Sequence, residues 1–107
     1  MSTIKYADVQ AILDEAVNHE EIGLHGAFWR TATRDEFVEK RVFGCPIIFR
    51  DEDGRFIGSE SPLVRILRGP TECPAGRDRP QMPRGFDPVS LDRIQEIEAW
   101  IDAQCPS

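Results

Sequence analysis

Two residues stand out in the sequence because their side chains are good ligands for a transition metal. His25 lies in the stretch EIGLHGAFW (residues 21–29), and Met82 follows 57 residues later (82 minus 25) in a proline-flanked loop. Imidazole and thioether groups both suit copper, so His19, His25 and Met82 are candidate copper ligands. However, a helix would not place His19 beside His25, six residues away. A lone histidine is also more often a hydrogen-bonded structural residue than a ligand.

No arrangement of residues in the sequence is typical of an enzyme. We find no convincing pair of nucleophile and general base, no glycine-rich loop that would hold a phosphate, and no His-Glu-x-x-His motif. We therefore expect a protein without catalytic activity of its own. An accessory role beside an enzyme stays open.

Three cysteines are spread widely along the chain, at Cys45, Cys73 and Cys105, and each is followed by proline. The wide spacing predicts reduced thiols, and the absence of a C-x-x-C pair argues against a zinc knuckle. Cys-Pro dipeptides occur as thiolate haem-binding motifs in some regulatory proteins. We favour the other interpretation, in which proline stops an element after a small buried cysteine.

The overall composition predicts one globular domain, spanning residues 1–107. Hydrophobic residues make up 40% of the chain and charged residues 30%, and the formal net charge of -6 disfavours nucleic-acid binding through phosphate contacts. No stretch approaches the roughly 20 apolar residues of a membrane span. The first residues also lack the apolar core of a signal peptide. We therefore expect a cytoplasmic protein that binds neither nucleic acid nor a membrane.

The spacing of apolar residues predicts an amphipathic helix near each end of the chain. They recur at three- and four-residue steps over about residues 6–20 and again from residue 91 to about residue 102. Because each helix has one apolar face to bury, we expect the two helices to pack against each other. Two shorter helices are expected between them. A capping box of Thr33 and Glu36 begins one over about residues 34–43, and Ser61-Pro62 begins another that ends near Arg68.

Two segments between these helices are less regular. Residues 46–58 (PIIFRDEDGRFIG) contain two short apolar runs around Asp53-Gly54, which suit a hairpin or a tight loop that lines a ligand. Residues 69–88 hold so many prolines and glycines that no helix or long strand is expected, and so long a loop is functional or mobile. Basic side chains gather in and before this loop, either as scattered solvated residues or as a docking patch for a protein partner: Arg65, Arg68, Arg77, Arg79 and Arg84.

Taken in order, these elements resemble a small class I cytochrome c domain. The resemblance depends on the histidine followed by aromatics, on SPLVRILRG (61–69) before PQMPRG (80–85), and on WIDA (100–103), and it spans nearly the whole chain. It implies an all-α fold of three to five helices, with packed terminal helices and a long Pro/Gly-rich loop. It also places His25 and Met82 at the positions of the axial haem ligands. Glu21 and Leu24 stand where the family's C-x-x-C-H has cysteines, so covalent haem cannot form at this site.

The resemblance leaves two functions open. In the first, which we favour, the domain binds no cofactor and serves as a haem-free accessory domain for a larger protein partner, such as an oxidoreductase. Since voids are costly, apolar side chains would fill the space of the haem. In the second, His25 and Met82 hold haem without covalent bonds and the protein carries electrons. The candidates for filling the space are Ile22, Leu24, Phe28, Trp29, Phe43, Ile47, Ile48, Phe49, Phe56 and Ile57.

Overall fold

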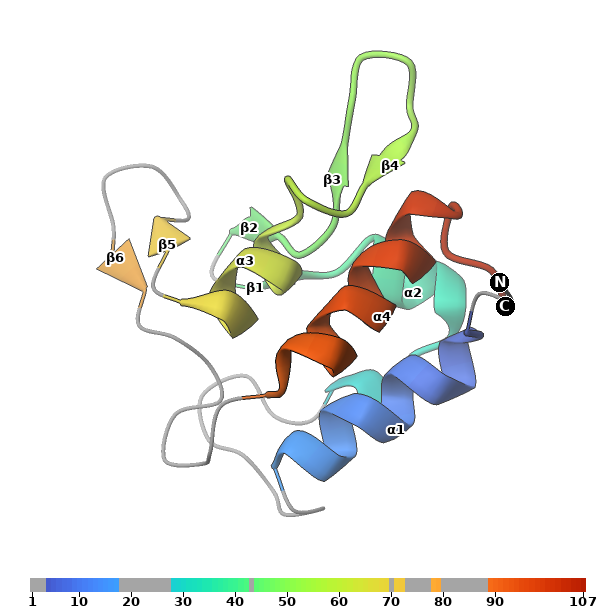
Figure 1. The fold of residues 1–107 in the computed structure, drawn as a ribbon. Coiled ribbons are helices and arrows are strands. Elements are labelled where there is room, and N and C mark those ends of the chain that lie inside the picture. Colours follow the sequence, from blue (N-terminus) through green and yellow to red (C-terminus); the bar gives the residue numbers. More distant parts are fainter. Residues whose placement is uncertain (1–3, 18–27, 43, 70, 73–77, 80–88) are drawn as a thin grey trace.

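The structure, a computed structural model, describes residues 4–17, 28–42, 44–69, 71–72, 78–79 and 89–107 (Figure 1). Four α-helices lie in these ranges: α1 (Tyr6–Ala16), α2 (Arg34–Val38), α3 (Pro62–Arg68) and α4 (Leu91–Asp102). A short 3-10 helix, η1, covers Phe28–Arg30. Six two-residue strands complete the described elements: β1 (Arg41–Val42), β2 (Cys45–Pro46), β3 (Phe49–Arg50), β4 (Phe56–Ile57), β5 (Thr71–Glu72) and β6 (Asp78–Arg79).

The fold is mixed α/β, so the expected all-α fold is wrong. The strands form three antiparallel pairs, β1 with β2, β3 with β4 and β5 with β6. Gly44 and Gly54 have φ angles of 81° and 83°, and this left-handed conformation lets the chain reverse tightly between β1 and β2 and between β3 and β4. β3 and β4 therefore form a hairpin within residues 46–58, as one of the two alternatives predicted.

The second helix is shorter than expected. α2 ends at Val38, whereas the sequence predicted a helix to about residue 43, because the chain turns into β1 and pairs with β2. The predicted start is confirmed: the Thr33 hydroxyl accepts from the Glu36 N–H, and the Glu36 carboxylate accepts from the Thr33 N–H at 2.8 Å. The predicted bounds of α3 and α4 are confirmed. The last residues of the predicted first helix, 18–20, lie outside the described residues.

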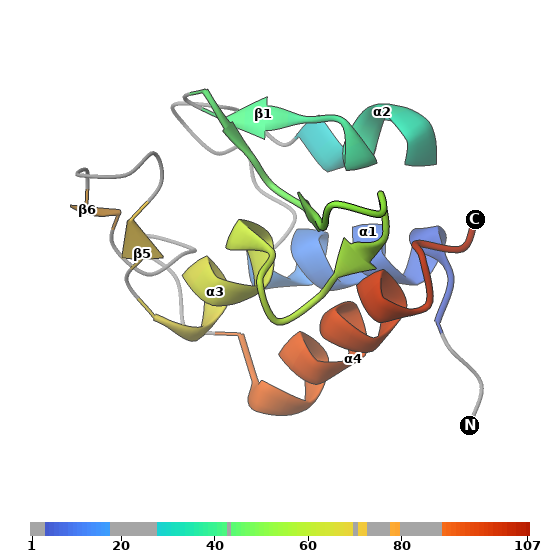
Figure 2. The same cartoon turned by 90° about the horizontal axis from the view of Figure 1, so that it is seen from above.

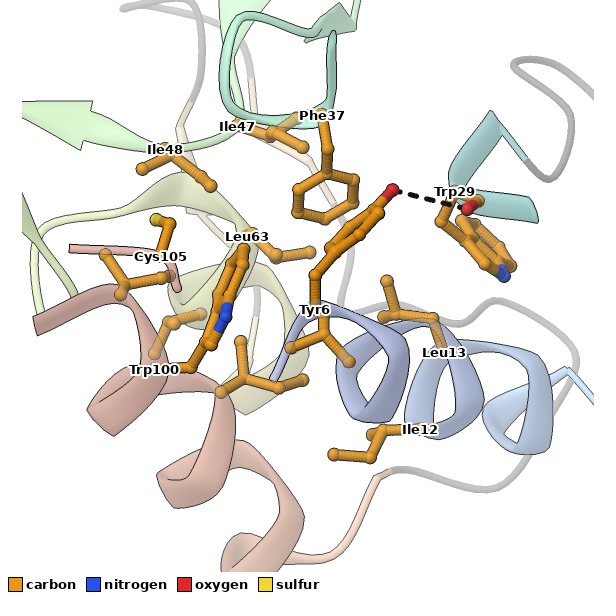
Figure 3. Packing of buried hydrophobic residues seen from close by; sticks show 14 of the residues in the cluster. Tyr6, Ile12, Leu13, Trp29, Phe37, Ile47, Ile48, Leu63, Trp100 and Cys105 are labelled. Atoms are coloured by element: carbon orange, nitrogen blue, oxygen red, sulfur yellow. Dashed lines mark hydrogen bonds between the residues drawn. The ribbon is translucent and has the colours of Figure 1, made fainter. Parts of the chain in front are cut away.

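The terminal helices α1 and α4 pack against each other, as their apolar faces predicted (Figure 1). Seen from above, α2 and β1 lie on one side of this pair (Figure 2). Three rings from three helices meet at the centre of the core (Figure 3): the Tyr6 ring centroid lies 5.3 Å from that of Phe37 and 6.0 Å from that of Trp100. Such aromatic contacts add to the stabilisation from burial. The core therefore joins the two ends of the chain to its middle.

Among the described residues, no helix combines the length and the apolar character that crossing a membrane requires.

Candidate functional site

The two candidate haem ligands, His25 and Met82, lie outside the described residues. The structure does describe the elements on both sides of them: α1 and η1 flank the segment of His25, and α3, β5, β6 and α4 flank that of Met82. The contacts of these described elements are therefore the basis for any candidate site. Other residues singled out in the sequence also lie outside the described part: His19, Glu21, Ile22, Leu24, Phe43, Cys73, Arg77 and Arg84.

The aromatic pair after His25 is held on the surface of α1. The Trp29 indole Nε1 donates to Asp14 Oδ1 at 2.7 Å, and the Arg30 guanidinium Nε contacts the same oxygen at 2.5 Å. The Trp29 carbonyl oxygen accepts from the Gln10 amide at 2.6 Å. Trp29 is buried, so its ring and its polar groups are all used to fix η1 on α1. This residue is a structural anchor of the segment that follows His25.

Phe28 extends the aromatic core beside Trp29. Its ring stacks on Phe37 with a centroid separation of 5.9 Å and meets Trp29 edge-on at 5.4 Å. The Lys40 ammonium lies over the Phe28 ring, 5.2 Å from its centroid. Five of the apolar residues named as candidates for replacing haem, Phe28, Trp29, Ile47, Ile48 and Phe56, therefore contribute to the core or pack on it. By contrast, Phe49 is 40% exposed and fills nothing.

The C-terminal stretch WIDAQCP (100–106) connects α4 to the rest of the domain. The Trp100 indole donates to the Pro106 carbonyl at 2.8 Å, and this carbonyl also accepts from the Tyr6 N–H at 3.2 Å. The Asp102 carboxylate accepts from the Gly58 N–H at 2.8 Å. Gly58 is required there, because an added Cβ would lie 2.5 Å from the Glu98 carbonyl oxygen.

Gln104 makes a two-way contact with the β3–β4 hairpin. Its amide oxygen accepts from the Phe56 N–H at 2.9 Å, and its amide nitrogen donates to the Phe56 carbonyl at 3.1 Å. The Arg34 guanidinium donates to the carbonyl oxygens of Gln104 and Cys105, at 2.9 and 2.6 Å. Sequence reasoning missed this set of contacts, since no local pattern marks a glutamine that bonds a strand 48 residues away.

Ser61 has a different role from the helix cap that its place before Pro62 predicted. Its side chain makes no capping bond to α3. Instead the buried hydroxyl donates to the Ile57 carbonyl at 2.7 Å and accepts from the Phe49 N–H at 3.0 Å. It thus joins β3, β4 and the start of α3.

The prediction of reduced thiols is wrong for Cys45, which is disulfide-bonded. Cys105 is free and fully buried. Burial raises the pKa of the Cys105 thiol to about 12, against the weaker lowering effect of the nearby Arg34 and Arg50 charges. This thiol is therefore protonated at neutral pH and poorly reactive.

The predicted arginine group is divided between paired and exposed side chains. The Arg68 guanidinium lies 2.5 Å from the Glu98 carboxylate of α4, so it fastens α3 to α4. Arg65 is exposed, and no carboxylate of the described residues forms an ion pair with it. The backbone of Arg79 lies in β6, opposite Thr71 of β5, which contacts α3. Figure 1 shows β5 and β6 beyond the end of α3. The structure thus places Arg65 and Arg68 on α3 and links this helix, through β5, to the strand that contains the backbone of Arg79.

In the described part of the chain, no three His, Cys, Asp or Glu side chains are grouped as metal ligands would be. Comparison with protein-family models, curated proteins and solved structures gave no match in any of the three cases.

Proposed function

We propose that the chain is a non-catalytic domain that binds a larger protein partner, with an oxidoreductase as the first class to test, and that it does so without haem. The observation that carries the proposal is the exposed Arg65 on α3, which forms no ion pair with a carboxylate of the described residues. An exposed positive group on a fixed helix is a feature that an acidic surface of a partner would recognise.

The rigid attachment of this surface supports the same proposal. Arg68 is in the last turn of α3 and pairs with Glu98 of α4, so α3 is held on the longest of the described helices. A docking side chain on a fixed helix loses less conformational freedom on binding than one on a loose segment. Arg65, one turn before Arg68, is therefore well placed for recognition.

The packing of Phe28 and Trp29 supports the haem-free form. Both aromatic residues follow His25 closely, and both are used in contacts with α1 and α2. These contacts leave less of the two side chains for lining a cofactor. The relation to class I cytochromes c stays a prediction, supported by the packing of α1 on α4.

The cofactor part of the proposal is tested by the absorption spectrum of protein purified from haem-supplemented cells and then titrated with haemin. We expect no Soret band above that of the His25→Ala variant, which is the matched control. A Soret band in the wild type that disappears in His25→Ala and changes in Met82→Ala would establish the alternative, a non-covalent haem protein that carries electrons.

The partner is sought by affinity capture on the immobilised full chain, followed by binding measurements with the purified candidate. We expect Arg65→Glu to weaken binding by about tenfold or more, as reversal of a contacting charge does. The control is Arg55→Glu, which changes an exposed arginine in the β3–β4 turn, on another part of the molecule (Figure 1). Equal affinities of the wild type and Arg65→Glu would contradict the proposed surface. Absence of any association well above micromolar concentration would contradict the function itself.

The cytoplasmic location expected from the sequence does not suit a chain that holds a disulfide. Disulfides are rare in the reducing cytoplasm, and Cys45 is disulfide-bonded.

A further inference from the structure

We infer that Cys45 and Cys73 form an intrachain disulfide that the folded domain needs, so that the domain works in a compartment where thiols are oxidised. The inference is independent of the proposed partner. It combines the state of Cys45 with the state of Cys105 and with the cysteine content of the chain.

The partner of Cys45 follows by elimination. The chain has three cysteines, Cys45 is disulfide-bonded, and Cys105 is free. Cys105 is also enclosed: its N–H donates to the Trp100 carbonyl at 2.9 Å, its carbonyl accepts from Arg34, and its side chain has no exposed surface. A bond within the chain therefore leaves Cys73 as the partner of Cys45.

The placement of Cys45 makes such a bond structurally useful. Cys45 is buried in β2, opposite Val42 of β1. Two residues later, the Ile47 carbonyl accepts from the N–H of Leu63 in α3 at 2.9 Å, so the chain after β2 is held against α3. β1 and β2 contain only two residues each, and an isolated pair of this size is marginally stable. A covalent bond at Cys45 would hold this pair in place.

The bond would also enclose several elements of the fold. The 27 residues between Cys45 and Cys73 (73 minus 45 minus 1) contain β3, β4, α3 and β5. Most of the stabilisation by a disulfide of this loop length comes from restricting the unfolded chain, in the entropic account of such bonds. Reduction is therefore expected to loosen the hairpin and α3 together.

The reaction needs an external oxidant of the disulfide class. A cysteine thiolate attacks the disulfide of the donor and forms a mixed disulfide, releasing one donor thiol. The second cysteine thiolate then displaces the other donor thiol and closes the protein disulfide. Two electrons pass from the protein to the donor, and the two protons of the protein thiols end on the two donor thiols.

Peptide mapping of the full chain tests the connectivity. The protein is exported to an oxidising compartment or refolded with oxidised and reduced glutathione, denatured, alkylated without reduction and digested with trypsin. We expect peptide 42–50 linked to peptide 69–77, and an alkylated Cys105 in peptide 94–107. Both linked peptides should separate on treatment with dithiothreitol. Alkylation of all three cysteines, or a link that includes Cys105, would overturn the inference.

Thermal unfolding tests whether the fold needs the bond. We expect dithiothreitol to lower the Tm of the wild type by about 15 °C, as loss of a disulfide closing a loop of this size would. Cys45→Ser and Cys73→Ser should both melt with the reduced wild type and be insensitive to dithiothreitol. Cys105→Ala, the matched control, should keep the reductant-dependent shift. A Tm that dithiothreitol does not change would contradict the inference even if the linked peptides were found.

Discussion

Replacing Gln104 with alanine is expected to remove the main polar contact between the C-terminal stretch and the β3–β4 hairpin. The Gln104 amide satisfies both the N–H and the carbonyl of Phe56, at 2.9 and 3.1 Å, and Phe56 is only 8% exposed. Leaving a buried backbone group without a partner costs about 1–3 kcal/mol. With two such groups and partial relaxation, we expect the free energy of unfolding to fall by about 2–4 kcal/mol.

A glycine at the same position separates the hydrogen bonds from the backbone conformation. Gln104 has a φ angle of 73°, in the left-handed region that residues with a Cβ adopt at a cost of about 1–2 kcal/mol. Gln104→Gly loses the same side-chain hydrogen bonds as Gln104→Ala but relieves this backbone strain. The glycine variant should therefore be more stable than the alanine variant by about 1 kcal/mol.

Urea unfolding followed by tryptophan fluorescence measures both differences, because Trp29 and Trp100 are buried in the core. The slopes of the transitions should be equal in the wild type and the two variants. A Gln104→Ala variant within about 0.5 kcal/mol of the wild type, the usual range for surface substitutions, would refute the role of the side chain. A glycine variant less stable than the alanine variant would refute the argument from backbone strain.

Three further predictions follow from contacts and pKa shifts elsewhere in the domain. Gly58→Ala should lower the free energy of unfolding by about 1–3 kcal/mol, because its Cβ would meet the Glu98 carbonyl at 2.5 Å; unchanged stability in urea would contradict this. Burial, assisted by the charge of Glu36, raises the pKa of Tyr6. The stability that the neutral Tyr6 phenol contributes should thus be complete below the unfolded pKa of about 10 and be lost as the pH rises through the folded pKa. In urea unfolding at increasing pH, Tyr6→Phe should reduce this alkaline loss of stability. An equal loss in the wild type and the variant would contradict the prediction. Finally, native Cys105 should react with Ellman's reagent at pH 8 at least about a hundredfold more slowly than in urea, since its thiol has a pKa of about 12; a rapid native reaction would show that the thiol is accessible.

The sequence alone was sufficient for features that depend on residues within about one helical turn of each other. The three- and four-residue spacing predicted α1 and α4 and their mutual packing, and Thr33 with Glu36 predicted the start of α2. These predictions hold because helix periodicity and capping are local interactions.

Only the tertiary structure decided which contacts join distant parts of the chain. α2 ends early and the fold is mixed because short strands pair across turns at Gly44 and Gly54, which compete with continued helix. Arg68 and Arg65 are alike in sequence, yet only Arg68 meets a described carboxylate, that of Glu98, 30 residues away (98 minus 68). The disulfide-bonded state of Cys45 and the hydrogen bonds between Gln104 and Phe56 also depend on contacts between distant segments. Each depends on which segments pack together in three dimensions, and no spacing of neighbouring residues specifies that choice.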